Sequence, residues 1–257
     1  MYARSMAKAK RLPLEGCYVI SLRPVGAHES LRRAAATRGA RALALSPWRI
    51  ETQDDVETWH ALRAALATDI VIATSPAAVR AASALQSLRK RRGQVWCAVG
   101  AGTASALRRA GIADVVSPSQ MDSDGLLALA ELQSLRGRSI GLLTAPGGRG
   151  VIAPTLRKRG ATVLRADVYR RVEIPFSPVA LARLRALRTK PWLALSSGEA
   201  LRHALTQLPA DLADTLRGAH VVAASERLAQ AAREAGFRGR IVVAASARPR
   251  DLVAAIG

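Results

Sequence analysis

The sequence predicts an α/β protein made of two similar lobes, each a parallel sheet flanked by helices, joined by a two-stranded linker. Short apolar runs alternate with amphipathic stretches along almost the whole chain, which is the pattern of repeated βα units. Apolar residues make up 49% of the chain and aromatic residues only 4%, so the core must consist mainly of Ala, Leu and Val, as in helices packed on a parallel sheet. Glycines follow several predicted helix ends, where a C-cap is expected: Gly39, Gly111, Gly160 and Gly236.

The first predicted elements are apolar runs of strand length, separated by arginine-rich stretches with helical spacing. A strand at 17–22 is followed by a helix around 28–38 and a strand at 42–45. Further strands are expected at 70–73, 95–99, 114–117, 139–143 and 162–168. The helices between them are expected at 77–91, 103–110, 123–132 and 151–159, the third of these with Ser123 as its N-cap.

The same alternation resumes after Pro178. Helices are expected at 179–187, 199–208, 227–235 and 251–256. Strands are expected at 192–195, 219–223 and 240–244. Repeated units of this length predict parallel pairing, with helices on both faces of each sheet.

A weak internal repeat divides the series of elements into two. Ala73-Thr-Ser-Pro-Ala-Ala-Val79 is similar to Leu195-Ser-Ser-Gly-Glu-Ala-Leu201. The segment 100–111 is similar to 225–236, at nearly the same separation along the chain. Repetition at one spacing indicates two lobes of the same fold.

Two extended segments, 46–52 and 168–175, interrupt the βα pattern and are interpreted as crossovers between the lobes. With two crossovers, one lobe is the middle of the chain and the other joins its two ends. The predicted inner lobe is 53–168, the outer lobe is 1–47 plus 173–257, and the linkers are 48–52 and 169–172.

The chain is strongly basic, with 39 Lys and Arg against 19 Asp and Glu and a formal net charge of +20. Such a charge favours a polyanionic partner: nucleic acid, anionic lipid or a polycarboxylate substrate. The alternative is that arginines simply coat the helix surfaces, and their spread along the chain fits this better than a nucleic-acid-binding stripe. No apolar run reaches membrane-spanning length and nothing resembles a signal peptide, which predicts a cytoplasmic protein.

Motifs for a metal or a nucleotide are missing from the sequence. The two cysteines and four histidines are isolated, without the spacing of zinc ligands. Pro146-Gly-Gly-Arg-Gly150 is placed to cradle an anion between a strand and a helix, but it lacks the Gly-Lys-Ser/Thr ending of a P-loop. We therefore expect neither a metal nor a cofactor, and expect any catalysis to depend on positioning and general acid chemistry.

Hydroxyl side chains follow several predicted strands at the point where a helix begins. Open parallel sheets bind ligands at these carboxyl ends, and free N–H groups of a helix N-terminus suit carboxylates. Each such residue taken alone is also explained by N-capping, for which Ser and Thr are the usual choice. As a set they favour a binding site: Thr74, Ser75, Thr103, Ser196, Ser197 and Ser225.

Tyr169 lies in Val168-Tyr-Arg-Arg171, at the predicted return crossover. A tyrosine at this point is placed to direct its hydroxyl into a cleft between the lobes. The alternative is a structural tyrosine packed beside the hinge. The residues alone leave both interpretations open.

Several short segments are informative through their order, although none is diagnostic by itself. They are Val19-Ile-Ser-Leu-Arg-Pro24, Ala73-Thr-Ser-Pro-Ala-Ala-Val79, Ala98-Val-Gly-Ala-Gly-Thr-Ala-Ser-Ala-Leu107, Ser123-Asp-Gly-Leu-Leu127, Gly147-Gly-Arg149, Val168-Tyr-Arg-Arg171 and Ala224-Ser-Glu-Arg-Leu228. This order resembles the uroporphyrinogen-III synthase family over residues 18–256. Leu22, Ala77 and Leu228 depart from the Thr, Asn and Thr that the family usually carries.

The resemblance implies two α/β lobes and a polycarboxylate substrate, hydroxymethylbilane. It implies a cyclising lyase of tetrapyrrole (heme) biosynthesis, which removes the terminal hydroxyl as water and inverts the last pyrrole ring. It also makes Tyr169 the acid that assists hydroxyl loss, in a monomer that receives its substrate from the preceding enzyme. With the strand-end hydroxyls, the expected substrate-binding residues are Arg23, Thr74, Ser75, Thr103, Ser123, Arg149, Ser196, Ser197, Ser225 and Arg227.

Two other functions stay open. The departures at Leu22, Ala77 and Leu228 would suit a catalytically weak relative that binds linear tetrapyrroles or porphyrinogens without closing them. The charge of +20 would suit a nucleic-acid-binding protein. That function ranks lower, because stacking aromatics are scarce and the basic residues are dispersed.

Overall fold

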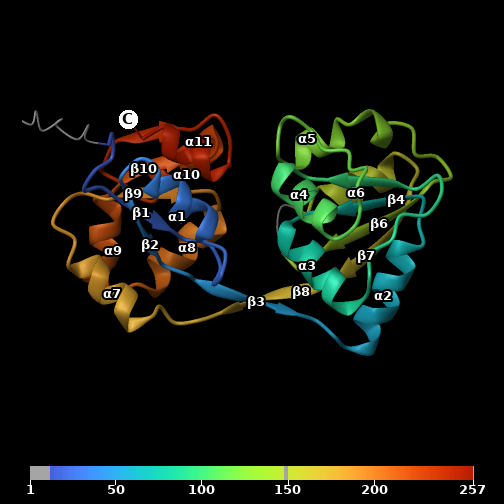
Figure 1. Cartoon of the computed structure of the whole chain (residues 1–257), viewed down its shortest axis with the longest axis horizontal. Coiled ribbons are helices and arrows are strands. Elements are labelled where there is room, and N and C mark those ends of the chain that lie inside the picture. The colour runs from blue at the N-terminus through green and yellow to red at the C-terminus, as the bar shows by residue number, and fades with distance from the viewer. Residues whose placement is uncertain (1–11, 148–149, 257) are drawn as a thin grey trace, which may run out of the picture. The chain divides into compact units, whose positions relative to one another are not determined.

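In the computed structural model the chain forms two compact units, which we describe separately. Unit 1 comprises Met1–Trp48 and Glu173–Gly257, and unit 2 comprises Arg49–Val172 (Figure 1). The structure describes residues 12–147 and 150–256. The chain passes between the units through β3 (Trp48–Thr52) and β8 (Tyr169–Glu173), which pair as a two-stranded sheet.

Unit 1 is built on a five-stranded sheet with the order β11-β10-β9-β1-β2. Neighbouring strands pair in parallel, and the register aligns Ser21 with both Ala44 and Ala194. The strands are β1 (Tyr18–Ser21), β2 (Arg41–Ala44), β9 (Trp192–Leu195), β10 (His220–Ala223) and β11 (Ile241–Val243).

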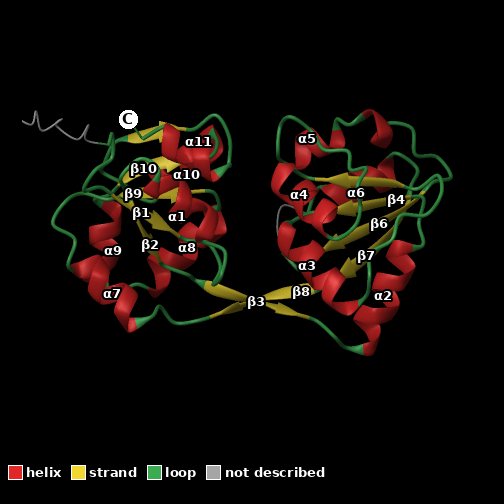
Figure 2. Ribbon diagram, viewed as in Figure 1, coloured by secondary structure: helices red, strands yellow, loops and turns green. Residues whose placement is uncertain are grey.

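Both faces of this sheet are covered, because successive residues of a strand point to opposite sides. Ile20 and Leu193 lie in an apolar cluster with α7 to α10, whereas Val19 and Ala194 lie in another with α1 and α11 (Figure 2). The helices are α1 (Glu29–Ala36), α7 (Pro178–Arg185), α8 (Gly198–Gln207), α9 (Ala210–Arg217), α10 (Glu226–Glu234) and α11 (Pro249–Ala254).

Unit 2 has a four-stranded parallel sheet with the order β5-β4-β6-β7. The strands are β4 (Ile70–Ala73), β5 (Val95–Ala98), β6 (Ser139–Thr144) and β7 (Thr162–Asp167). One face packs on α2 (Val56–Leu66), α3 (Pro76–Leu85) and α4 (Ala101–Arg109). The other packs on α5 (Ser123–Leu127), the short 3₁₀ helix η1 (Ala130–Leu132) and α6 (Ile152–Lys158).

The predicted fold class is confirmed: each unit is a parallel sheet with helices on both faces, and a two-stranded sheet is present. The predicted C-cap glycines also behave as expected. All four have positive φ, a conformation that costs glycine little: Gly111, Gly160 and Gly236 directly follow the C-cap residues of their helices, and Gly39 lies two residues after the C-cap of α1.

Helices α2 and α9 were missing from the sequence-based expectation. Asp55 caps α2 by accepting a hydrogen bond from the Thr58 N–H at 2.8 Å, but the buried stripe of this helix has few large apolar residues. Gly141 of β6 explains how closely α2 sits on the sheet: a Cβ at this residue would lie 1.9 Å from the Ala65 carbonyl oxygen. Helix α9 is short, and it begins directly after Pro209.

Two further expectations were wrong. Residues 114–117 form no strand; Val116 makes a single bridge to Cys97 at the edge of the sheet. Ser123 is the first residue of α5 and not its cap, because the Asp122 carboxylate takes that role by accepting from the Gly125 N–H at 2.8 Å. A carboxylate at this position also complements the helix dipole.

Across residues 12–147 and 150–256, no helix is both long and apolar enough to cross a membrane. The longest, α2, has 11 residues.

Candidate active site

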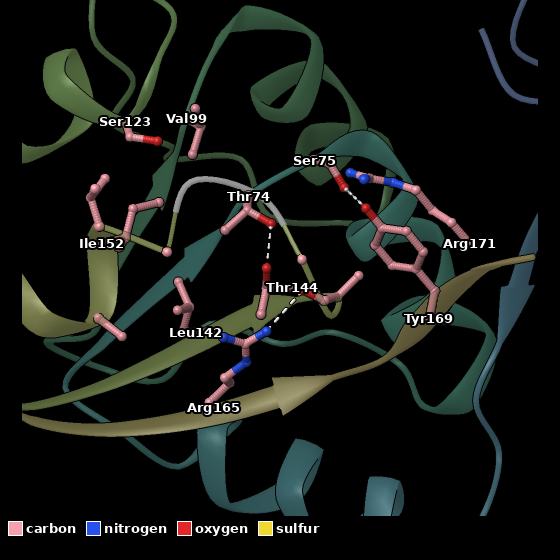
Figure 3. Close-up of a pocket in the computed structure, with 15 residues that line it drawn as sticks. Thr74, Ser75, Val99, Ser123, Leu142, Thr144, Ile152, Arg165, Tyr169 and Arg171 are labelled. Atoms are coloured by element: carbon pink, nitrogen blue, oxygen red, sulfur yellow. Dashed lines mark hydrogen bonds between the residues drawn. The ribbon is translucent and has the colours of Figure 1, made fainter. Parts of the chain in front are cut away.

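A pocket opens in unit 2 where the sheet connections diverge. The chain leaves β4 toward β5 and leaves β6 toward β7, so the topological switch point lies between β4 and β6. Open parallel sheets bind ligands at such a point, outside the carboxyl ends of the strands. The pocket has a volume of about 200 Å³ (Figure 3). It is lined by Thr74, Ser75, Val99, Ser123, Leu142, Thr144, Ala145, Gly147, Gly150, Val151, Ile152, Ala153, Arg165, Tyr169 and Arg171.

Thr74 and Thr144 meet across the switch point. They come directly after Ala73 and Leu143, the last two residues that pair between β4 and β6. The Thr74 hydroxyl lies 3.0 Å from the Thr144 hydroxyl and 3.2 Å from the Leu143 carbonyl oxygen, to which it donates. The two strand ends therefore present a pair of hydroxyls at the floor of the pocket.

Ser75 joins the start of α3 to Tyr169. Its Oγ accepts a hydrogen bond from the Ala78 N–H at 3.0 Å, which caps the helix. The same oxygen lies 3.1 Å from the Tyr169 hydroxyl, and Figure 3 shows the two hydroxyls directed at each other. Either hydroxyl has the geometry to donate in this pair.

Tyr169 is held firmly by its surroundings. It is the first residue of β8, it is 4% exposed, and its ring packs in the apolar cluster under α3 and α4. The two interpretations of this tyrosine are thus compatible: the ring is structural, while the hydroxyl reaches the pocket. A rigid ring fixes the position of the hydroxyl, which a proton donor requires.

Two arginines give the pocket a positive lining. Arg165 of β7 pairs with Asp167 at 2.8 Å and donates to the Ala145 carbonyl at 2.9 Å, which ties the loop after β6 to the sheet. Arg171 of β8 places its guanidinium group beside the Ser75 and Tyr169 hydroxyls (Figure 3). Arginine suits a carboxylate because its planar fork donates two parallel hydrogen bonds.

The structure brings four of the predicted site residues together in this pocket: Thr74, Ser75, Ser123 and Tyr169. Thr103 is 4% exposed within α4 and is not part of the lining that the described residues form. Arg149 lies outside the described residues.

The other predicted residues lie in unit 1, at the carboxyl ends of its central strands: Arg23 after β1, Ser196 and Ser197 after β9, and Ser225 and Arg227 after β10. Ser197 is an N-cap, accepting from the Ala200 N–H at 3.2 Å. Ser225 occupies the cap position of α10 without a capping hydrogen bond from its hydroxyl. Arg227 is exposed.

A buried histidine near this edge was not anticipated. His28 is 7% exposed, and its ring nitrogens lie 2.9 Å from Ser21 Oγ and 2.7 Å from Ser46 Oγ. Burial, with the positive charges of Arg32 and Arg23, lowers the pKa of His28 to about 4. The ring is therefore neutral at physiological pH.

Comparison with known proteins agrees with this arrangement. Residues 29–254 match the family model described as uroporphyrinogen-III synthase HemD. The chain belongs to this family.

Individual relatives in the uroporphyrinogen-III synthase family are moderately similar. The chain is 32% identical over 145 residues to uroporphyrinogen-III synthase of Escherichia coli, a match that covers 56% of this chain and 59% of that protein. It is 32% identical over 178 residues to the Salmonella typhimurium protein of the same name, covering 66% and 71%. The chain thus matches somewhat less than two thirds of the length of the first relative.

Solved structures of family members share the fold. A uroporphyrinogen III synthase variant of Thermus thermophilus has a TM-score of 0.58 at 21% identity, covering 93% of this chain and 97% of that one. The Helicobacter pylori uroporphyrinogen-III synthetase has a TM-score of 0.58 at 14% identity, covering 93% and 96%. At these identities the likeness concerns the architecture alone.

The departures from the usual family pattern have a structural explanation at two positions. Leu22 and Leu228 are 5% and 4% exposed and pack in the same apolar cluster of unit 1. They fill the core there. Ala77 lies in the first turn of α3, half-buried against the cluster around α2 to α4.

Sequence reasoning missed Thr144, Arg165 and Arg171 as pocket residues. Thr144 was detectable in principle, because it directly follows the predicted strand 139–143, as Thr74 follows the predicted strand 70–73. Arg165 was not, because it lies within a strand and its nearness to Ala145 depends on the pairing of β6 with β7. Among the described residues, no cluster of three or more His, Cys, Asp or Glu side chains is arranged to hold a metal ion.

Proposed function

We propose that this chain catalyses the reaction of its family, the closure of hydroxymethylbilane to uroporphyrinogen III with loss of water and inversion of the last pyrrole ring. The supporting observation is the Ser75–Tyr169 hydroxyl pair in a pocket lined by two arginines, in a chain of this family. In this proposal the protein is a cyclising hydro-lyase of heme biosynthesis.

In the proposed mechanism Tyr169 is the general acid. Its O–H proton passes to the terminal hydroxyl of the bilane, the C–O bond breaks, and water leaves, with the electron pair of the pyrrole nitrogen forming the azafulvene electrophile. Ser75 supports this step if its hydroxyl donates to the Tyr169 oxygen, because the phenol proton then stays available and the phenolate is stabilised. Ser75 Oγ can do so while accepting from the Ala78 N–H.

The last ring then attacks through its already substituted carbon, giving the spiro intermediate that allows inversion. The proton released when the ring system regains aromaticity restores Tyr169. Catalysis of this path requires that its transition states be stabilised more than those of direct closure. A rigid Tyr169, buried in the cluster under α3 and α4, supports the positional control that this demands.

The arginines supply carboxylate recognition in this proposal. Arg165 and Arg171 flank the hydroxyl cluster and suit the acidic side chains of a pyrrole ring. Pockets for drug-sized ligands enclose ~300–1,000 Å³. A pocket of about 200 Å³ therefore suits one ring of the substrate, the one that carries the leaving hydroxyl.

The proposal also covers where the protein acts and how it receives its substrate. We place the activity in the cytoplasm, which the free thiols of Cys17 and Cys97 support. Transfer of a short-lived substrate from the preceding enzyme, and action as a monomer, belong to the same proposal.

The test supplies freshly generated hydroxymethylbilane, oxidises the products and separates the uroporphyrin isomers by chromatography. The proposal predicts mainly the type III isomer, against type I in a reaction without protein. Type I alone, from a folded protein, would refute cyclisation and leave a tetrapyrrole-binding role to be measured by direct titration.

A further inference from the structure

The only run of four consecutive basic residues in the chain, Arg89-Lys-Arg-Arg92, lies at the edge of unit 2 opposite the pocket. The run belongs to the loop that leaves α3 and enters β5 at Val95, so it lies at the amino ends of the parallel strands. The pocket opens at their carboxyl ends, and it includes none of these basic residues. The charge of the loop therefore needs an explanation apart from the proposed active site.

Gln94 holds this loop in a fixed shape. The residue is 4% exposed, and its amide nitrogen donates to the carbonyl oxygens of Leu66 at 3.1 Å and Thr68 at 2.7 Å. Its amide oxygen accepts from the Arg91 N–H at 3.1 Å and from the Trp96 indole N–H at 2.9 Å. These bonds use both donors and both lone pairs of the amide. The backbone of the basic loop is thus tied to the end of α2 and to β5.

The end of α4 places further cations beside the loop. Helix α4 packs beside α3 (Figure 1), and Lys90 Nζ lies 3.1 Å from the carboxylate of Asp114, in the segment that follows α4. Arg108 and Arg109 are exposed in the last turn of α4. We call the cations of these two segments the basic surface: Arg89, Lys90, Arg91, Arg92, Arg108 and Arg109.

Helix electrostatics explains only part of the basic surface. Cations in a last turn complement the helix dipole, which accounts for Arg108 and Arg109. The loop residues are not explained in this way, because α3 has already ended at its C-cap, Gln86. Arg89 and Arg92 are exposed, and neither has a hydrogen-bond or ion-pair partner among the described residues. Like charges gathered in this way repel one another, and a polyanionic partner removes that repulsion.

The composition of the basic surface favours phosphate groups as its ligand. Most of its cations are arginines, whose planar fork matches phosphate. Protein interfaces bury aromatic and apolar side chains at their centres, and membrane-surface helices insert apolar ones. None of the large apolar side chains that are exposed in the described part of the chain lies in 86–94 or 108–114. The same residues offer no aromatic platform for the bases of a single strand, so a duplex backbone fits best.

We propose that the basic surface binds the phosphodiester backbone of a nucleic-acid duplex without reading its sequence. The arginines displace counterions from the phosphates, so binding weakens as salt is added. Because Gln94 holds the loop in shape, less conformational entropy is lost on binding. The basic residues are dispersed along the sequence, which ranked nucleic acid low as a partner, but the fold brings two basic segments together.

The test uses the full-length protein and labelled RNA and DNA duplexes of one sequence, each about 16 base pairs long. Fluorescence anisotropy gives Kd over a series of KCl concentrations. For Arg89→Gln/Arg92→Gln, Kd should rise for every duplex sequence, and the slope of log Kd against log salt should fall by about 2, one for each lost phosphate contact. The duplex that the wild-type protein binds more tightly identifies RNA or DNA as the natural source of the backbone.

Arg183→Gln/Arg188→Gln is the matched control. It removes two exposed arginines from unit 1 and changes the net charge by the same amount. Its affinity and salt slope should stay close to those of the wild-type protein. Equal losses in the two double variants would show a general effect of net charge and would overturn the proposal.

Gln94→Met tests the shape of the loop, since it keeps every charge and a side chain of similar length. Duplex binding should weaken and amide exchange at Arg91 should become faster, while the circular dichroism spectrum stays unchanged. Binding as tight as that of the wild-type protein would refute the role of Gln94. If Gln94→Met does not fold, the variants at the exposed Arg89 and Arg92 still decide on the surface itself.

The duplex assignment is overturned if Arg89→Gln/Arg92→Gln keeps the affinity and salt slope of the wild-type protein. It is also overturned if polyglutamate or phosphatidylglycerol vesicles compete as well as the duplex at equal charge, which would assign the surface to an acidic protein or to a membrane. Type III isomer formation by Arg89→Gln/Arg92→Gln should equal that of the wild-type protein. A wild-type protein that binds the duplex but forms no type III isomer would refute the proposed function and leave the basic surface standing.

Discussion

Ser75 Oγ lies 3.1 Å from the Tyr169 hydroxyl while it accepts the Ala78 N–H at 3.0 Å. One hydroxyl thus caps a helix and orients a phenol that lies 94 positions further along the chain. The capping bond holds the serine and the buried ring holds the tyrosine. Both hydroxyls are therefore fixed in position at the wall of the pocket.

Tyr169→Phe removes the proposed acid and little else, because the ring stays in its apolar cluster. We expect kcat to fall by about 10²- to 10⁴-fold, the usual contribution of general acid catalysis, with a small change in KM. Steady-state kinetics with isomer analysis measures this, and circular dichroism confirms the fold. A variant with full kcat would exclude Tyr169 as the acid.

Ser75→Ala separates the capping role from the role toward Tyr169. Loss of a serine cap should cost about 1 kcal/mol of stability. Asp55→Ala is the control, because the Asp55 side chain caps α2 by accepting from the Thr58 N–H at 2.8 Å and is not among the residues that line the pocket. Urea denaturation should show similar losses in both variants, whereas kcat should fall only in Ser75→Ala. Equal kcat in the two would show that Ser75 is a cap alone.

Arg165→Gln tests carboxylate recognition in the pocket. We expect KM to rise by about tenfold, with kcat largely kept, because a charge-assisted hydrogen bond to the bound substrate is lost. Arg138→Gln is the control: Arg138 pairs with Asp69 at 4.0 Å, beside the opposite ends of β4 and β6 in the same sheet. A similar rise of KM in both variants would indicate a general effect of charge.

His28 should make stability depend on pH. Its pKa is lowered from the usual 6.5 of histidine to about 4, by burial first and by the charges of Arg32 and Arg23 next. Between these values the unfolded chain binds more protons, so the stabilisation is complete above pH 6.5 and is lost as the pH falls toward about 4. The slope is at most about 1.4 kcal/mol per pH unit for one proton. Urea denaturation of wild type and His28→Gln across this range should give diverging curves; parallel curves would contradict the assignment.

Gly141→Ala tests how closely α2 packs against the sheet. The added Cβ would lie 1.9 Å from the Ala65 carbonyl oxygen, so the helix must move away from β6. We expect a loss of about 3 kcal/mol, at the upper end of overpacking effects. Gly102→Ala in α4 is the control, since its nearest neighbour is 3.7 Å away, and it should be neutral or stabilising by up to about 1 kcal/mol. Equal denaturation midpoints for Gly141→Ala and wild type would show that α2 is packed less closely.

The sequence by itself determined the order of βα units, the parallel pairing and the glycine caps, because these depend on short-range patterns of apolar residues and on the φ angles that glycine permits. The family resemblance was also readable, since it rests on segments in linear order. Prediction failed where the local signal was weak. Helix α2 buries Thr58, Leu62, Ala65 and Leu66, which is too sparse a stripe to recognise, and the segment 114–117 has strand-like residues but a single bridging partner.

The tertiary structure alone decided which hydroxyls form a site. Thr74 and Ser75 were named from their positions after a strand and Tyr169 from its position at the return crossover, and all three line the pocket. Thr103, also chosen as a strand-end hydroxyl, is buried in α4. Thr144 and Arg165 joined the pocket through the register of β6 with β4 and β7. Such relationships follow from strand register and burial, which are properties of the packed chain and not of any local segment.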